Sequence, residues 1–144
     1  KYPIQVAGKS ADIHGELSEY INKDKSALLK SLVKYLGNHI IVGHNISFDI
    51  RMINNELKRT FNVTLKNKVI DTAHLVKRLD PVKYERTVGG NTNLHLDDLC
   101  KEYTIPVENR HTALGDAFMT AQLLQRLLVK LKRRGISKAQ SLVS

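Results

Sequence analysis

The stretch "HIIVGHNISFDIRMINNEL", residues 39–57, decides the fold. Its first half, His39–Asn45, is a short β-branched run closed by glycine, which is typical of a buried strand. Ser47 then stands where a helix N-cap is expected. Apolar residues follow at helical spacing as far as about Arg59, namely Ile50, Ile53 and Leu57. The stretch therefore predicts a strand that turns directly into an amphipathic helix.

The sequence on both sides of this stretch repeats the same alternation. Upstream, a helix is predicted from a cap at Asp24 or Ser26 to about Leu36. Downstream, Lys68–Thr72 reads as a second short strand, and a helix over Thr72–Leu79 follows it directly. The residues of that helix expected to face inward are Leu75, Val76 and Leu79.

The second half of the chain is expected to be mostly helical. Pro81–Thr92 is polar and contains glycine, so it is predicted to be a surface loop, and Asn93 is the expected cap of the next helix. The last helix is predicted over Ala113–Arg133 and ends before Gly135. One side of it is expected to hold Leu114, Phe118, Ala121, Leu124, Leu128 and Leu131. Helices that alternate with short buried strands predict an α/β domain.

Composition limits the classes of protein to which this chain can belong. Of its 144 residues 42% are hydrophobic and 26% are charged, so a globular domain is expected rather than a disordered one. The single cysteine, Cys100, excludes an internal disulfide framework and favours a reducing compartment, so we expect the protein to be cytoplasmic. No apolar run approaches the roughly 18 residues of a membrane span, and no membrane partner is expected.

The formal net charge of +9 favours a polyanionic partner, because fixed positive charge attracts phosphates and displaces their counterions. A solvated surface that only keeps the protein in solution is the alternative, and charge alone leaves both open. Five cations cluster near the end of the chain, with no acidic residue among them: Lys130, Lys132, Arg133, Arg134 and Lys138.

Two segments place histidine and aspartate at points where helices begin. "GHNISFD" has His44, Asn45 and Asp49 where the predicted strand turns into a helix, and "HTALGD" has His111 and Asp116 where a loop enters the last helix. Strand ends and helix starts are where α/β proteins assemble sites. The helix dipole favours a carboxylate in the first turn, which is one interpretation of both aspartates. The other is that they bind a hard divalent cation, which prefers oxygen ligands.

The spacing of His111 and Asp116 suggests a second role. Five residues do not place two side chains on one face of a continuous helix. If His111 precedes the helix on a mobile loop, its imidazole can reach a metal ion that Asp116 holds. A histidine can then take a proton from water. An ordinary surface histidine is the alternative, and spacing alone does not decide between them.

The other titratable residues give weaker signals. His14, His39, His74 and His95 have no spacing typical of a zinc site, and surface or packing positions are expected for them. Asp71 ends a predicted strand and is interpreted as the cap of the helix that follows, in preference to a site residue.

The motifs resemble those of a known family. "VGHNISFDIRMINNEL" (residues 42–57) and "NRHTALGDAFMTAQLL" (residues 109–124) are similar to the second and third motifs of the DEDDh 3′→5′ exonucleases, which include the epsilon proofreading subunit of bacterial DNA polymerase III. "VIDTAHLVKRL" and "NLHLDDLCKEYTI" resemble the linking elements of that family, and "IHGE" at residues 13–16 resembles a segment before its first helix. The resemblance spans about residues 1–131.

This resemblance implies a fold and an activity. The implied fold is RNase H-like, a mixed β-sheet flanked by helices, and the activity is removal of nucleotides from 3′ ends with two Mg²⁺ or Mn²⁺ ions. Carried over, Asp49 and Asp116 are metal-binding catalytic carboxylates, and His111 is the general base. Positions near the terminal nucleotide correspond to His44, Asn45 and Phe48.

The chain departs from the family at its first motif. The family has an Asp-x-Glu on its first strand, and this sequence contains none, so we expect an exonuclease-like domain over residues 1–135 that lacks the first strands, followed by a basic or polar tail over 136–144. The expected partners are nucleic acid, above all DNA 3′ ends, and polymerase subunits or a fused domain. A non-catalytic nucleic-acid-binding or interaction module on the same fold is the alternative, and DNA cannot be distinguished from RNA.

Overall fold

The computed structural model describes residues 25–85, 94–107, 111–136 and 142–143. The elements follow the order α2 (Lys25–Leu36), β1 (Ile41–Gly43), α3 (Ser47–Phe61), β2 (Val69–Asp71), α4 (Thr72–Leu79), α5 (Pro81–Glu85), α6 (Leu96–Glu102) and α7 (Ala113–Arg133). Helices alternate with short strands, which confirms the predicted α/β class. The "IHGE" segment, most of the predicted loop and the Asn93 cap lie outside the described residues.

Strands β1 and β2 form a parallel pair in which Ile41 lies opposite Val69 and Gly43 lies opposite Asp71. Parallel neighbours need a crossover connection, and α3 supplies it. The carboxyl ends of both strands therefore meet at one edge, where α3 and α4 begin. The described sheet consists of these two parallel strands.

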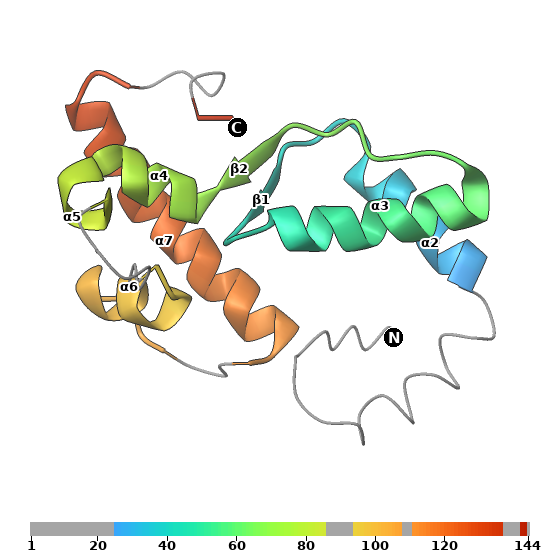
Figure 1. The fold of residues 1–144 in the computed structure, drawn as a ribbon. Coiled ribbons are helices and arrows are strands. Elements are labelled where there is room, and N and C mark those ends of the chain that lie inside the picture. The colour runs from blue at the N-terminus through green and yellow to red at the C-terminus, as the bar shows by residue number, and fades with distance from the viewer. Residues whose placement is uncertain (1–24, 86–93, 108–110, 137–141, 144) are drawn as a thin grey trace.

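The main hydrophobic core lies against one side of this sheet. It packs Ile70 of β2 together with apolar residues of α4, α6 and α7. Figure 1 shows α4, α5, α6 and α7 gathered at one end of the strands, and α2 and α3 at the other. Cys100 is fully buried in this core. Leu142, from the expected tail, is also buried in it, so this part of the tail packs on the domain.

Both strands are shorter than predicted. The expected strands over His39–Asn45 and Lys68–Thr72 shrink to three residues each, because the backbone of Asn45 turns left-handed at φ 54° and Thr72 already begins α4. The N-cap prediction for Ser47 is wrong: Ser47 is the first helical residue of α3, and the cap position belongs to Ile46.

The last helix has the predicted bounds, but its predicted inward face is right only at Leu131, which is fully buried, and at Leu124, which is partly buried against the core. Leu114 and Phe118 are 82% and 66% exposed. The face that packs on the core instead holds Gly115, Met119, Thr120, Leu123, Leu127 and Leu131. Leucines occur in adjacent pairs at 123–124 and 127–128, so two neighbouring stripes fit helical spacing equally well. Only packing against α4 and α6 selects the stripe that is buried.

The region predicted to be a polar loop contains a further short helix, α5, at Pro81–Glu85. Proline at the first helical position favours this, because the missing N–H would have no partner there. The next helix, α6, has His95 at its N-cap position. None of the described helices is both long enough and apolar enough to cross a membrane.

Candidate functional site

A tight turn after β1 brings the first candidate residues to the edge of the sheet. A Cβ atom on Gly43 would lie 2.5 Å from Ile46 Cδ1, so only glycine fits this approach. The left-handed Asn45 that follows donates its backbone N–H to Asp71 Oδ1 at 2.9 Å. The same oxygen accepts the N–H of Ala73 at 2.9 Å. Asp71 thus caps α4, as predicted, and also joins the ends of the two strands.

His44 holds the turn from the other side. Its Nδ1 lies 2.8 Å from Thr72 Oγ1, and its Nε2 lies 2.6 Å from the carbonyl oxygen of Leu94. A carbonyl oxygen can only accept, so Nε2 carries a hydrogen in this arrangement. Thr72 Oγ1 donates in turn to the carbonyl of Gly43 at 3.2 Å. The half-buried imidazole of His44 therefore links β1, α4 and the segment before α6.

We expect the Gly43→Ala variant to lower the free energy of unfolding by about 1–3 kcal/mol, because the added methyl group must displace the side chain of Ile46. Urea unfolding followed by circular dichroism measures this. Gly135→Ala is the control, since its Cβ would meet nothing within 4 Å although its φ of 77° is strained for alanine. Gly43 itself has no positive φ, so an unchanged free energy of unfolding in Gly43→Ala would contradict a cost set by the contact with Ile46.

Asp49 and Asp116 line one open cavity of about 640 Å³. Asp49 lies in the first turn of α3 and is exposed, and Asp116 lies in the first turn of α7 and is half-buried. Three alanines of α7 line the same cavity: Ala113, Ala117 and Ala121. The fold therefore gathers on one cavity two acids that are far apart in the sequence, as the motifs predicted.

His111 stands beside Asp116 through its backbone. Its N–H donates to Asp116 Oδ1 at 3.2 Å, and its own backbone is left-handed, with φ 67°. Thr112 caps α7 by accepting the N–H of Gly115 at 3.0 Å. The exposed imidazole of His111 thus precedes the helix, as predicted, on a turn that is fixed to the carboxylate it would serve.

The remaining predicted residues take different positions. Asn45 and His44 line the cavity, whereas Phe48 lies outside it on α3 and is 57% exposed. The guanidinium of Arg51 lies 5.5 Å from the centre of the Phe48 ring. His95 lines the cavity too, although a surface or packing role was expected from the sequence. Its place immediately before α6, at a helix start like the other site residues, was the available signal.

Two carboxylates, those of Asp49 and Asp116, are among the side chains that line the cavity. No group of three His, Cys, Asp or Glu side chains suited to a metal ion occurs among the residues that the structure describes. Mg²⁺, however, is commonly held by one or two carboxylates together with waters and substrate phosphates. Asp49 and Asp116 supply that number of carboxylates, and the open cavity has room for the other ligands.

Comparisons with known proteins relate this chain to one family. A family model described as "Exonuclease" matches residues 4–124. The chain is 33% identical over 134 residues to "DNA polymerase III PolC-type" of Bacillus subtilis, covering 92% of the chain and 8% of the relative. It is 31% identical over 128 residues to the protein of the same name from Oceanobacillus iheyensis, covering 88% of the chain and 8% of the relative. The chain thus spans less than a tenth of the length of these relatives.

Proposed function

This chain belongs to the exonuclease family, and from that premise we propose that it is a metal-dependent 3′→5′ exonuclease domain that removes nucleotides from DNA 3′ ends. The observation that carries the proposal is the shared cavity of Asp49 and Asp116. Members of this family generally use divalent metal ions, and we propose Mg²⁺ or Mn²⁺ here. DNA is favoured over RNA because the polymerase relatives are named for DNA.

Asp49 and Asp116 would hold the cation. When bound, it supplies positive charge against the phosphate oxygens that become more negative during hydrolysis. The two carboxylates suit one ion. A second ion, which the resemblance implies, needs carboxylates beyond these two, and the Asp-x-Glu that would supply them is absent from the 144 residues. Tests of activity therefore use the whole protein that the gene of this chain encodes.

His111 is proposed as the general base that takes a proton from the attacking water. Its exposed imidazole does not line the cavity in this structure, and the proposed role requires it to turn there while its backbone N–H stays on Asp116 Oδ1. This bond keeps the base close to the carboxylate that holds the cation, and a positioned base contributes about 10²–10⁴-fold to a reaction rate.

The terminal nucleotide is proposed to lie along the turn from β1 into α3. His44 fixes that turn through both ring nitrogens, and the exposed side chain of Asn45 lines the cavity. The ring of Phe48, which is 57% exposed, offers a surface on which a base can stack. Arg51 beside it supplies positive charge for a phosphate. The exonuclease domain is proposed to span residues 1–135 together with Leu142, which packs in its core, and its proposed protein partners are polymerase subunits or a fused domain.

Shortening of a DNA strand labelled at its 5′ end tests the proposal. With Mn²⁺ the whole protein is expected to shorten the strand stepwise from the 3′ end, and Asp116→Ala is expected to abolish this. Asp98→Ala is the matched control, because Asp98 also lies in the first turn of a helix but does not line the cavity. Binding of DNA without any metal-dependent shortening would instead support the non-catalytic nucleic-acid-binding module.

A further inference from the structure

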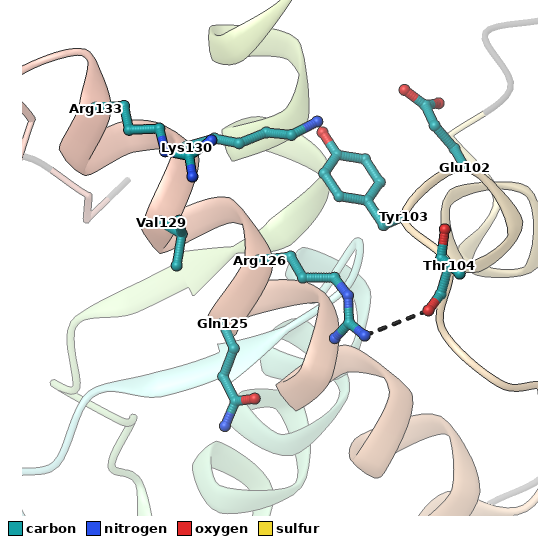
Figure 2. Close-up of a pocket in the computed structure, with 8 residues that line it drawn as sticks. All are labelled: Glu102, Tyr103, Thr104, Gln125, Arg126, Val129, Lys130 and Arg133. Atoms are coloured by element: carbon teal, nitrogen blue, oxygen red, sulfur yellow. Dashed lines mark hydrogen bonds between the residues drawn. The ribbon is translucent and has the colours of Figure 1, made fainter.

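A groove lies between the end of α6 and the second half of α7. Its volume is about 430 Å³, and its lining includes Tyr103, Thr104, Arg126, Lys130 and Arg133. Figure 2 shows the side chains from α7 on one wall and Tyr103 and Thr104 on the other. Arg126, Lys130 and Arg133 are spaced by four and three residues, so they form one row along the helix.

Contacts across the groove hold two of these cations in place. Arg126 Nη2 donates to the carbonyl oxygen of Thr104 at 3.3 Å, the contact dashed in Figure 2, and Nη1 lies 3.5 Å from the carbonyl oxygen of Gln122. The ammonium of Lys130 lies 4.1 Å from the centre of the Tyr103 ring. A guanidinium has five N–H donors, so Arg126 keeps donors for a ligand. Cations held in this way lose less conformational entropy when they bind one.

The groove also contains an acidic residue, Glu102, whose negative charge is already paired. Glu102 Oε1 lies 2.6 Å from Lys83 Nζ, and Glu102 Oε2 accepts a hydrogen bond from the Tyr84 hydroxyl at 2.8 Å. Burial raises the pKa of Glu102, but these two hydrogen bonds outweigh it and the pKa lies below the ordinary value. No Asp or Glu follows Asp116 in the sequence. The part of α7 that lines the groove therefore carries three cations and no acid of its own, and Glu102 across the groove interacts electrostatically with Lys130.

The groove is separate from the cavity of Asp49 and Asp116. The two share no lining residue. Along α7, Asp116 and Lys130 are about 21 Å apart at 1.5 Å per residue. Ten residues separate Asp116 from Arg126, which turns the two side chains about 80° apart around the helix axis, at 100° per residue. The α7 residues that line the groove and those that line the cavity lie on either side of the buried stripe that holds Leu123 and Leu127.

We propose that this groove binds the sugar-phosphate backbone of a nucleic acid at a distance from its 3′ end. A guanidinium fork matches two oxygens of one phosphate, and the groove offers two arginines with a lysine between them. A nucleic acid is favoured over an acidic polypeptide because an exonuclease already brings a long polyanion to the protein. The binding does not depend on Asp49, Asp116 or His111, so it stands apart from the proposed hydrolysis.

Binding of a closed circular single-stranded DNA tests this, because a circle has no 3′ end. Affinity is measured by fluorescence anisotropy in EDTA over a range of salt concentrations. Replacing all three groove cations by glutamine is expected to weaken binding about tenfold or more, and to reduce the slope of log affinity against log salt by about 2. Lys130→Gln alone is expected to reduce the slope by about 0.7. Asp116→Asn is expected not to weaken binding of the DNA circle. This expectation holds whether or not the protein hydrolyses DNA.

In the matched control, glutamine replaces three exposed lysines of α2, α3 and the segment before β2: Lys34, Lys58 and Lys66. Thermal melting establishes that each variant remains folded. Equal weakening by the control and the groove variants would overturn the proposal, because net charge alone would then account for binding. It would also be overturned if polyglutamate of equal charge bound as tightly as the DNA circle and with the same dependence on the groove cations.

Discussion

The His111→Ala variant is expected to slow metal-dependent shortening of DNA by about 10²–10⁴-fold, because the proposed general base is removed while the carboxylates remain. Mn²⁺ affinity is expected to change by less than about threefold, since the contact of His111 with Asp116 is made by its backbone N–H. The rate of shortening of a labelled strand at saturating Mn²⁺ measures the first effect, and calorimetric titration with Mn²⁺ measures the second.

His74→Ala is the matched control for this experiment. His74 is an exposed histidine that does not line the cavity, so its loss is expected to leave the rate unchanged. A loss of Mn²⁺ affinity as large as that of Asp116→Asn would contradict the assigned role.

The second large effect concerns stability. Leu127→Ala is expected to lower the free energy of unfolding by about 2–5 kcal/mol, because Leu127 is fully buried in the main core and its truncation leaves a cavity. Leu114→Ala is expected to change it by less than about 0.5 kcal/mol, since Leu114 is 82% exposed. Chemical unfolding followed by circular dichroism measures both variants.

The Leu114→Ala and Leu127→Ala variants distinguish between the two faces of α7 that could be buried. The spacing of apolar residues fits a buried stripe through Leu114 as well as it fits the observed stripe through Leu127. A larger loss of stability in Leu114→Ala than in Leu127→Ala would mean that the helix is rotated relative to its packing in this structure, and Asp116 would then no longer face the cavity.

Local sequence signals predict much of this fold. Helix bounds follow from apolar spacing and breakers, so α4 and α7 begin and end where expected. The motifs predict the RNase H-like class, which the exonuclease family match confirms. The face of α7, the helix α5 and the length of the strands depend on contacts between distant segments, which residue spacing does not encode.

The candidate site was likewise predicted from the sequence only in part. Motif order placed Asp49 and Asp116 at two helix starts, and the packing of α7 against β1 brings these starts to one cavity. The joining role of Asp71 was not predictable, because its bond to the N–H of Asn45 spans 26 residues of sequence. His44 and Leu94, whose carbonyl oxygen it contacts, lie even farther apart in the sequence, at 50 residues.

Titration with Mn²⁺ of the whole protein, the Asp49→Asn variant and the Asp116→Asn variant tests the central claim most directly. If the two carboxylates share one cation, each substitution is expected to weaken Mn²⁺ binding about tenfold or more, and the double variant little further, because the site is already lost. Asp98→Asn is expected to leave the affinity unchanged, since Asp98 lies outside the cavity. Unchanged Mn²⁺ affinity in either cavity variant, or additive losses from two independent weak sites, would contradict the claim.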